Sequence, residues 1–312
     1  MAGPLPRWGL ASTIKAPRAE ILRFAAWHLE LGAHRLYIYL DDPESDAFDS
    51  LKAHPKIRVR RCDATWWRRH NGRRPAKHQL RQSVNATHAY ARPAEVDWMA
   101  HVDVDEFLMP SGNMADTLAA LPPDRMTLRV RPSESLAGTG NLFKAFVPSG
   151  PERQPIVDRL YPTFGPYLRG GFVSHTAGKV FARTGMPGVT IRIHNAFRGQ
   201  DMNPGEAELG DVELLHCHAR DWPTWLAHYR FRLDRGSYRA DLPSLRPAEK
   251  GGMSLHDLFV WLEQEEGEAG LRAFYDEVLS DAAGLPDRLR AAGLLRHHVL
   301  PLDDLLARHF AE

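Results

Sequence analysis

The sequence lacks the features that mark several large classes of protein. It holds two cysteines, Cys62 and Cys217, and no CxxC pair, so we expect neither a disulfide framework nor a zinc knuckle, and a reducing compartment fits. Forty Lys and Arg stand against 39 Asp and Glu, which leaves a net charge of +1. No global field therefore favours nucleic acid or a membrane, and any basic partner surface must be local.

Long hydrophobic runs are also missing. The longest, Leu36–Leu40 and Leu258–Leu262, fall far short of the ~20 residues that span a bilayer. The chain does not begin with a positively charged stretch followed by an apolar core, so we expect no signal peptide. We predict a cytoplasmic protein without a transmembrane segment, and peripheral contact with the inner face of a membrane stays open.

What is present is an ordinary globular composition with alternating strand and helix patterns. The apolar fraction of 43% and the charged fraction of 25% are typical of a soluble domain with a full core. The patterns predict strands over residues 9–15, 36–40, 56–62, 97–102 and 125–130, and helices over 19–31, 48–54, 76–91 and 116–121. Strands that alternate with helices predict an α/β fold with a doubly wound, mostly parallel sheet flanked by helices.

The second half of the chain reads differently. Residues 132–210 are rich in Gly and Pro, so we expect an irregular, substrate-facing region with short strands at 179–182 and 190–193. Helices are predicted over 222–232, 255–265, 270–279, 287–295 and 302–310. We therefore divide the chain into a main domain, residues 1–240, and a helical C-terminal extension, residues 241–312. The main domain has a nucleotide-side half, about 1–131, and an acceptor-side half, about 132–240.

The most informative segment is Asp97–Leu108, an apolar strand pattern that runs into three carboxylates. Packed negative charges repel and are costly to bury. A cation between Asp103 and Asp105 would remove that repulsion, since residues i and i+2 of a strand end share one face. Oxygen ligands favour Mg²⁺ or Mn²⁺. The alternative is a solvated acidic turn.

A second acidic strand end, Asp41 and Asp42, precedes Pro43. Both acidic segments fall at the carboxyl ends of predicted parallel strands, where α/β sheets bind ligands. These carboxylates could accept hydrogen bonds from a nucleotide base or ribose, or could simply form a turn.

The segment Trp66–Lys77 is the strongest basic patch, and we expect it to be a loop beside the same crevice. Its arginines could pair with phosphates and its tryptophans could stack on a base or a sugar. A solvated basic loop and a nucleic-acid surface are the alternatives. The neutral total charge and the acidic strand ends weigh against nucleic acid.

Several segments resemble the GT-A glycosyltransferases, and among them the family 2-like group. Ile21–Gly32 resembles that group's "WH-x-x-x-G" helix, and Tyr37–Asp46 its strand followed by an acidic loop. Asp97-Trp98 with Asp103–Leu108 is similar to its "DW…DVDEF" block, and Leu215–Gly236 to its "HY…RG" segment. The sequence departs from the pattern at Lys15-Ala16-Pro17, where the group has "K-N-E". If His216 is the matching histidine, Cys217 stands in place of a tyrosine; the alternative match is His228-Tyr229, which keeps the His-Tyr pair.

The resemblance implies an inverting glycosyltransferase of the hexosyl type, active in surface or extracellular polysaccharide biosynthesis. It would transfer a sugar from a nucleotide-sugar, a UDP-sugar, to a glycan or other acceptor hydroxyl, with Mn²⁺ or Mg²⁺ stabilising the leaving diphosphate. Metal binding is assigned to Asp103, Asp105 and His216. The nucleotide-sugar is assigned to Asp41, Asp42, Asp103, Arg81, Asn85 and Lys179. The general base that an inverting enzyme needs is assigned to Asp158, with Glu134 as the other candidate. Trp27 and His28 are expected to be packing residues.

Two other functions stay open. Aspartyl-phosphate phosphatases share a strand followed by Asp-x-Asp, with the first Asp as nucleophile and Mg²⁺ required, although their motif usually continues Gly-Thr, and Glu106-Phe107 follows here. A non-catalytic nucleotide- or glycan-binding module is the third hypothesis, because a fold does not fix a function.

Overall fold

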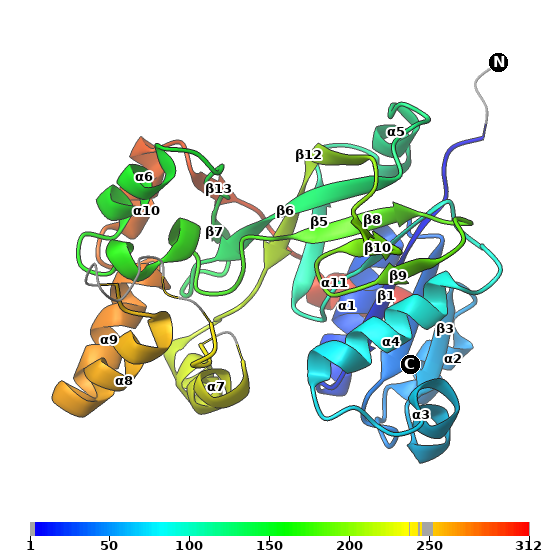
Figure 1. Cartoon of the computed structure of the whole chain (residues 1–312), viewed down its shortest axis with the longest axis horizontal. Coiled ribbons are helices and arrows are strands. Elements are labelled where there is room, and N and C mark those ends of the chain that lie inside the picture. Colours follow the sequence, from blue (N-terminus) through cyan, green and yellow to red (C-terminus); the bar gives the residue numbers. More distant parts are fainter. Residues whose placement is uncertain (1–3, 237, 243, 245–251, 312) are drawn as a thin grey trace. The chain divides into compact units, whose positions relative to one another are not determined.

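The computed structural model describes residues 4–236, 238–242, 244 and 252–311, which form two compact units (Figure 1). The first unit comprises residues 1–131, 177–214 and 301–312, and the second comprises 132–176 and 215–300. The predicted division after residue 131 stays a prediction. The last twelve residues return to the first unit, and the predicted boundary after residue 240 stays a prediction.

The first unit is built on a mostly parallel sheet. Strands β1 (Trp8–Ile14), β2 (Arg35–Leu40), β3 (Ile57–Arg61) and β4 (Trp98–His101) run parallel in the order β4-β1-β2-β3. Next to β4 come β8 (Lys179–Arg183) and then β6 (Thr127–Ser135), each antiparallel to its neighbour. Strand β5 (Glu106–Pro110) pairs with β12 (Glu206–His216). The predicted fold class is therefore confirmed.

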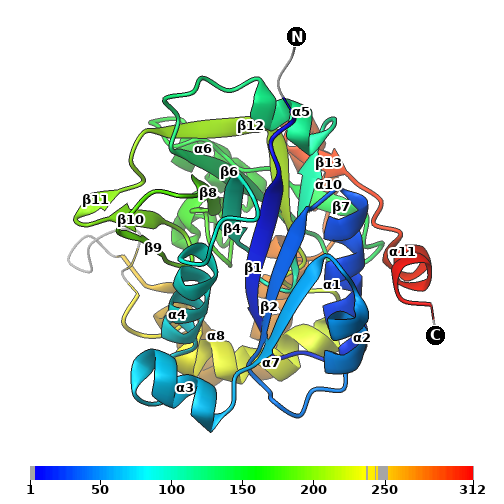
Figure 2. The same cartoon turned by 90° about the vertical axis from the view of Figure 1, so that its right-hand side faces the viewer.

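Helices cover both faces of this sheet (Figure 2). One face packs on α1 (Arg18–Glu30), α2 (Phe48–Ala53), α5 (Met114–Ala119) and α11 (Leu302–His309). The other packs on α3 (Ala64–Asn71) and α4 (His78–Tyr90) and on a small sheet of β9 (Val189–Ile191), β10 (Ala196–Arg198) and β11 (Asp201–Met202). Strand β2 is buried along almost its whole length, as a continuous apolar run predicts. Trp27 and His28 are buried in α1, as expected.

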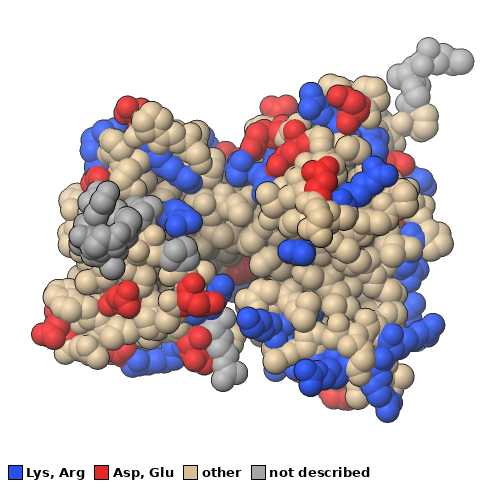
Figure 3. All heavy atoms as spheres, viewed as in Figure 1, with Lys and Arg blue, Asp and Glu red and all other residues tan. Residues whose placement is uncertain are grey.

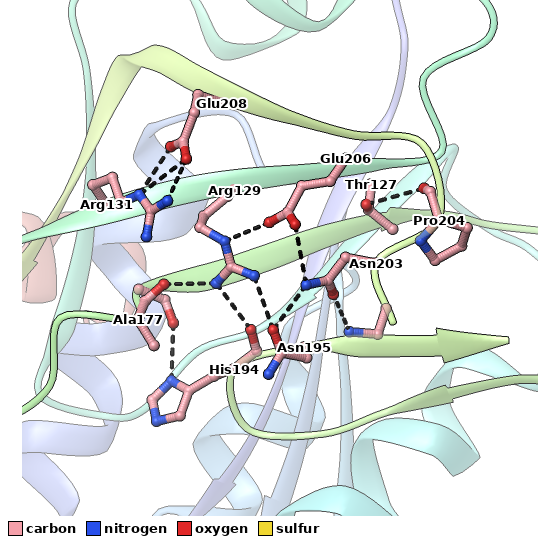
Figure 4. A network of polar contacts seen from close by, with 12 residues as sticks. Thr127, Arg129, Arg131, Ala177, His194, Asn195, Asn203, Pro204, Glu206 and Glu208 are labelled. Atoms are coloured by element: carbon pink, nitrogen blue, oxygen red, sulfur yellow. Dashed lines mark hydrogen bonds and ion pairs between the residues drawn. The ribbon is translucent and has the colours of Figure 1, made fainter. Parts of the chain in front are cut away.

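A polar network ties β6 to the later segments of this unit (Figure 4). The guanidinium group of Arg129 is paired with Glu206 and donates to the carbonyl oxygens of Ala177 and His194 and to Oδ1 of Asn195. Asn203 donates to the same Asn195 oxygen at 2.8 Å. Since Arg129 is almost fully buried, these acceptors provide the compensation that a buried charge requires.

The second unit holds the ends of β6 and β12, the short strands β7 (Leu142–Lys144) and β13 (Leu295–His297), and most of the C-terminal helices. Its helices are α6 (Arg153–Leu160), α7 (Trp222–Arg235), α8 (Leu255–Glu265), α9 (Gly267–Val278) and α10 (Leu285–Ala291), with 3₁₀ turns η1 (Gly165–Tyr167) and η2 (Arg169–Gly171). They enclose their own aromatic core around Trp225 and Phe259. The predicted helical C-terminal region is confirmed.

Two expectations about local structure are wrong. The basic segment that we expected to be a loop begins with α3, because the carboxylate of Asp63 accepts the backbone N–H of Trp66 and caps a helix there. The region 132–210, expected to be irregular, contains the end of β6, the helix α6 and the start of β12, whereas the short strands predicted there correspond to β8 and β9.

Candidate functional site

A hollow of about 520 Å³ lies at the carboxyl ends of β1, β2 and β3. We call it the edge hollow. Residues that directly follow all three strands line it, together with α3 and the segment after α3; among them are Lys15, Asp41, Asp42, Trp67, Arg68 and Arg74. This is the edge at which parallel α/β sheets bind ligands. The structure therefore brings the acidic end of β2 and the basic segment together.

Asp41 is the most constrained group of the edge hollow. Its side chain is 1% exposed, and Oδ2 accepts hydrogen bonds from Arg74 at 2.9 Å and from Arg81 at 3.0 Å. Its other oxygen, Oδ1, is buried and has no hydrogen-bond partner among the described residues. A buried acceptor without a donor is costly, so a ligand donor at this position would be favourable. Asp42 is exposed and accepts the N–H of Glu44, which is the turn-forming role.

Three residues of helix α3, namely Ala64, Trp67 and Arg68, line the edge hollow. Trp67 is 1% exposed, and Arg68 follows it into the lining. Gly72, with φ of 75°, ends the helix in a conformation that glycine adopts without strain. The chain then returns to the hollow at Arg73 and Arg74. Arg68, Arg73 and Arg74 therefore line the same hollow as Asp41.

The acidic segment after β4 is a β-turn, and this corrects the expectation of a shared strand face. The N–H of Glu106 donates to the carbonyl oxygen of Asp103 at 3.1 Å, and β4 has already ended at His101. Asp103 and Asp105 therefore sit on a turn, where strand alternation does not apply. Asp105 is half-buried and is the third residue of this turn.

Asp103 is already neutralised inside the first unit. The ammonium group of Lys179 lies 2.5 Å from its Oδ2 and 3.1 Å from Oε2 of Glu106, and Gln82 donates to its Oδ1. Burial opposes ionisation of Asp103, but Lys179 outweighs that cost and holds its pKa below the usual range. Lys179 thus compensates the charges of Asp103 and Glu106, and a cation between Asp103 and Asp105 stays a prediction.

Lys179 and Asn85 lie in the interior. Lys179 is fully buried and is occupied by the two carboxylates. Asn85 is also fully buried; it donates to Thr13 at 3.1 Å and accepts from the indole N–H of Trp66 at 3.0 Å. Arg81 is partly buried and binds Asp41. Of the residues assigned to the nucleotide-sugar, Asp41 and Asp42 line the edge hollow directly, and Arg81 reaches it through Asp41.

The sequence pattern did not identify three residues that lie near the acidic turn. Gln82 binds Asp103, and His78 on α4 is close enough to both Asp103 and Asp41 for their charges to act on its pKa. His101 is 2% exposed, and neither ring nitrogen has a hydrogen-bond partner among the described residues. Burial lowers its pKa to about 4, so it is neutral at pH 7. His78, Gln82 and Asn85 are spaced i, i+4 and i+7, which places them on one face of α4. This spacing could have identified His78 and Gln82 from the sequence.

The second unit holds the remaining candidates. Glu134 and Lys144 lie opposite each other on β6 and β7, 2.7 Å apart and both fully buried. Burial opposes the charge of Glu134, but Lys144, a hydrogen bond from Ser174 and nearby His216 outweigh it and lower its pKa. Glu134 is thus occupied as an ion-pair partner. Asp158, on α6, is half-buried and accepts from Gln154 at 2.7 Å.

His216 ends β12 beside a second histidine that the sequence did not single out. The ring centroids of His175 and His216 are 5.3 Å apart, and one ring nitrogen of each lies within 4.8 Å of the other. Two imidazoles at this spacing could contribute ligands to one divalent cation.

No family model matches the sequence, and no curated protein matches it either. None of the described helices is long and apolar enough to span a membrane. Among solved structures, the chain is similar to a mycobacterial protein at 12% identity, with a TM-score of 0.36 over 80% of this chain and 82% of that one. It is also similar to HddC from Yersinia pseudotuberculosis, at 11% identity and a TM-score of 0.30 over 57% of this chain and 77% of that one. The galactosyltransferase LgtC, in complex with donor and acceptor sugar analogues, is a further neighbour. It shares 14% identity and a TM-score of 0.26 over 56% of this chain and 57% of that one.

Proposed function

We propose that this protein is a glycosyltransferase that binds a nucleotide-sugar, a UDP-sugar, in the edge hollow and transfers the sugar to an acceptor hydroxyl. The observation that carries the proposal is the buried, unpartnered Oδ1 of Asp41 at the carboxyl edge of a parallel sheet. A nucleotide offers donors for such an acceptor, namely the N–H of a uracil ring and the hydroxyls of ribose. Arg74 and Arg81 hold the carboxylate in place through its other oxygen.

The charges around the edge hollow support the same proposal. Lys15, Arg68, Arg73 and Arg74 line it, and a diphosphate leaving group develops negative charge as its bond to the sugar breaks. Cations fixed beside that position stabilise the transition state more than the ground state. Arginine also binds phosphate oxygens in a bidentate manner. Trp67, buried in the same wall, offers an aromatic surface to the ligand.

A divalent cation, Mn²⁺ or Mg²⁺, belongs to the proposal with a revised ligand set. Asp105 and His216 remain the ligands that the sequence assigns, and within the second unit His175 lies beside His216. Asp103 becomes a positioning residue, because Lys179 and Gln82 already occupy its carboxylate. The cation would act as a Lewis acid toward the diphosphate. Asp158 remains the proposed base that takes the proton of the acceptor hydroxyl in an inverting transfer, and Glu134 is set aside because Lys144 holds it.

The test is binding of UDP, GDP and dTDP and of their sugars, measured by thermal shift and calorimetry with and without Mn²⁺. In Asp41→Asn, Arg74 and Arg81 should keep the amide oxygen, which leaves an NH₂ donor where Oδ1 was. Nucleotide affinity should then fall about tenfold or more, since a buried donor would face a donor. Asp46→Asn, an exposed residue of the same loop that does not line the hollow, is the control.

Unchanged nucleotide affinity in Asp41→Asn would contradict the proposal. Hydrolysis of para-nitrophenyl phosphate that depends on Asp103 would favour the phosphatase alternative instead. Nucleotide binding without sugar transfer or donor hydrolysis would favour the non-catalytic module.

A further inference from the structure

The helix α3 separates the edge hollow from a second hollow of about 450 Å³ beside β3. Trp67 and Arg68 line the edge hollow, whereas Trp66, Arg69 and His70 line the second one. The latter three are spaced i, i+3 and i+4, which places them on one side of a helix. The edge strand β3 adds Arg60 and Arg61. We call this the arginine hollow.

The arginine hollow has an excess of positive charge. Arg60, Arg61 and Arg69 line it, and none of the three makes an ion pair with any residue that the structure describes. One acidic residue, Asp63, is in the described lining, and its carboxylate is engaged as the cap of α3, accepting from Trp66 N at 2.7 Å. When its histidines are neutral, the three arginines and Asp63 give the lining a formal charge of +2. This charge is equal and opposite to that of a dianion.

Some arginines elsewhere in this unit are paired with carboxylates, in contrast to the three of the arginine hollow. Arg35 and Arg58 each reach Glu95 at 2.8 Å, and Arg23 is paired with Asp303. In the space-filling view, blue side chains gather over the part of the first unit where α3 and β3 lie (Figure 3). Charges of one sign without counterions raise the local potential and attract an ion of the opposite sign.

The wall of the arginine hollow is preorganised by contacts between aromatic rings, one pair tilted and one edge to face. Trp66 and His70 have ring centroids 3.9 Å apart, and His70 and His88 4.7 Å apart. The hydroxyl of Tyr39 fixes Nδ1 of His88 at 2.7 Å. Burial lowers the pKa of His88 to about 4, with further lowering by His70 and by neighbouring arginines. This lowering by cations is independent support for a positive potential in the hollow.

We propose that the arginine hollow is a second anion site, which binds a phosphate group as its dianion through Arg60, Arg61 and Arg69. Phosphate fits better than a single carboxylate because three guanidinium groups offer more donors and charge than one carboxylate can use. Arg61 is already oriented, since its guanidinium group lies 4.0 Å from the centre of the Phe48 ring. The phosphate could be free or carried by a lipid head group. The site is distinct from the proposed nucleotide site and does not depend on it.

The experiment is calorimetric titration of inorganic phosphate into the full chain and into three variants. Arg69→Ala and Arg60→Ala should each weaken phosphate binding about tenfold or more, as loss of a charge-assisted hydrogen bond predicts. Arg198→Ala is the control, since Arg198 is an exposed arginine of the same unit that lines neither hollow; it should leave phosphate binding unchanged. All three arginines are exposed, and thermal melting verifies that the variants fold.

A second arm identifies the source of the phosphate. Cosedimentation is measured with phosphatidylcholine vesicles that contain or lack phosphatidic acid. Binding that requires phosphatidic acid and Arg69 identifies a lipid head group, whereas binding of free phosphate alone identifies a soluble ligand, and both results support the site. Phosphate binding that survives Arg69→Ala and Arg60→Ala, or that is lost in Arg198→Ala, overturns it. Absence of binding in both arms overturns it as well.

Discussion

The ammonium group of Lys179 lies 2.5 Å from Oδ2 of Asp103, and both belong to one buried charge cluster with Glu106. Lys179 and Glu106 are fully buried, and Asp103 is 29% exposed. Burial opposes the charge on Lys179, but the two carboxylates outweigh it and keep its pKa above the usual value. The cluster fixes the turn that carries Asp105, because Glu106 also accepts the N–H of Asp103 at 2.8 Å.

We expect Lys179→Met to destabilise the protein by about 3–5 kcal/mol, since removal of one partner leaves the carboxylates without compensation. The free energy of unfolding is measured by urea denaturation. Lys15→Met removes an exposed lysine at the same edge of the sheet and should change it little. Adding Asp103→Asn to Lys179→Met should restore part of the loss. A Lys179→Met protein as stable as the wild type would show that the ion pair does not hold the turn.

Much of the candidate site followed from the order of elements along the chain. The carboxyl ends of β2 and β4 do carry Asp41 and, just after β4, Asp103, because parallel strands end at one edge. The burial of Lys179 did not follow, since its partner Asp103 is 76 residues away and lysine is mostly exposed. Helix α3 was missed because Trp66–Asn71 lacks an apolar period, although Asp63 was an available capping signal.

The turn explains why the two aspartates should differ in a metal experiment. Asp105→Ala should abolish sugar transfer and weaken Mn²⁺ binding at least tenfold, roughly the least that a direct ligand contributes, while the melting temperature stays unchanged. Mn²⁺ binding is followed by electron paramagnetic resonance, which does not depend on turnover. Asp116→Ala, at an exposed position of α5, is the control. Full metal-dependent turnover in Asp105→Ala would remove this residue from the proposed ligands.

His216→Ala should weaken Mn²⁺ binding more mildly than Asp105→Ala, because His175 lies beside it and can supply an imidazole. The double variant His175→Ala with His216→Ala should therefore bind Mn²⁺ more weakly than either single variant. The same resonance titration measures all three proteins. Coincident titration curves for the wild type and His216→Ala would exclude His216 as a ligand.

The ion-pair cluster around Glu95 predicts how stability depends on acid. Arg35 and Arg58 both donate to Glu95 at 2.8 Å. Burial opposes its charge, but the two arginines outweigh that effect and lower the pKa of Glu95 from 4.5 to about 2. A lowered carboxylate pKa gives stability that is present above pH 4.5 and is lost as the pH falls toward 2.

We therefore expect Glu95→Gln to lower the free energy of unfolding by about 1–2 kcal/mol at pH 7, a value reduced for solvent screening. The free energy of unfolding should also depend less on pH between these two pKa values. Urea denaturation at several pH values measures both. Asp124→Asn, which breaks the exposed pair with Arg125, should change neither. If the stability of Glu95→Gln fell with acid as steeply as that of the wild type, other carboxylates would be responsible for the pH dependence.

The pair Glu134 and Lys144 separates a structural carboxylate from a catalytic one. Because both side chains are fully buried 2.7 Å apart, Glu134→Gln leaves an ammonium ion without its partner and should cost about 3–5 kcal/mol of stability. Asp158→Asn keeps the shape of a half-buried side chain that accepts a hydrogen bond from Gln154, so stability should change by no more than about 0.5 kcal/mol. If Asp158 is the base, Asp158→Asn should lower kcat by about a hundredfold or more and remove the acidic limb of the pH profile, with the donor affinity unchanged. An Asp158→Asn enzyme that keeps its pH profile would show that another group accepts the proton, whereas the stability result for Glu134→Gln would stand by itself.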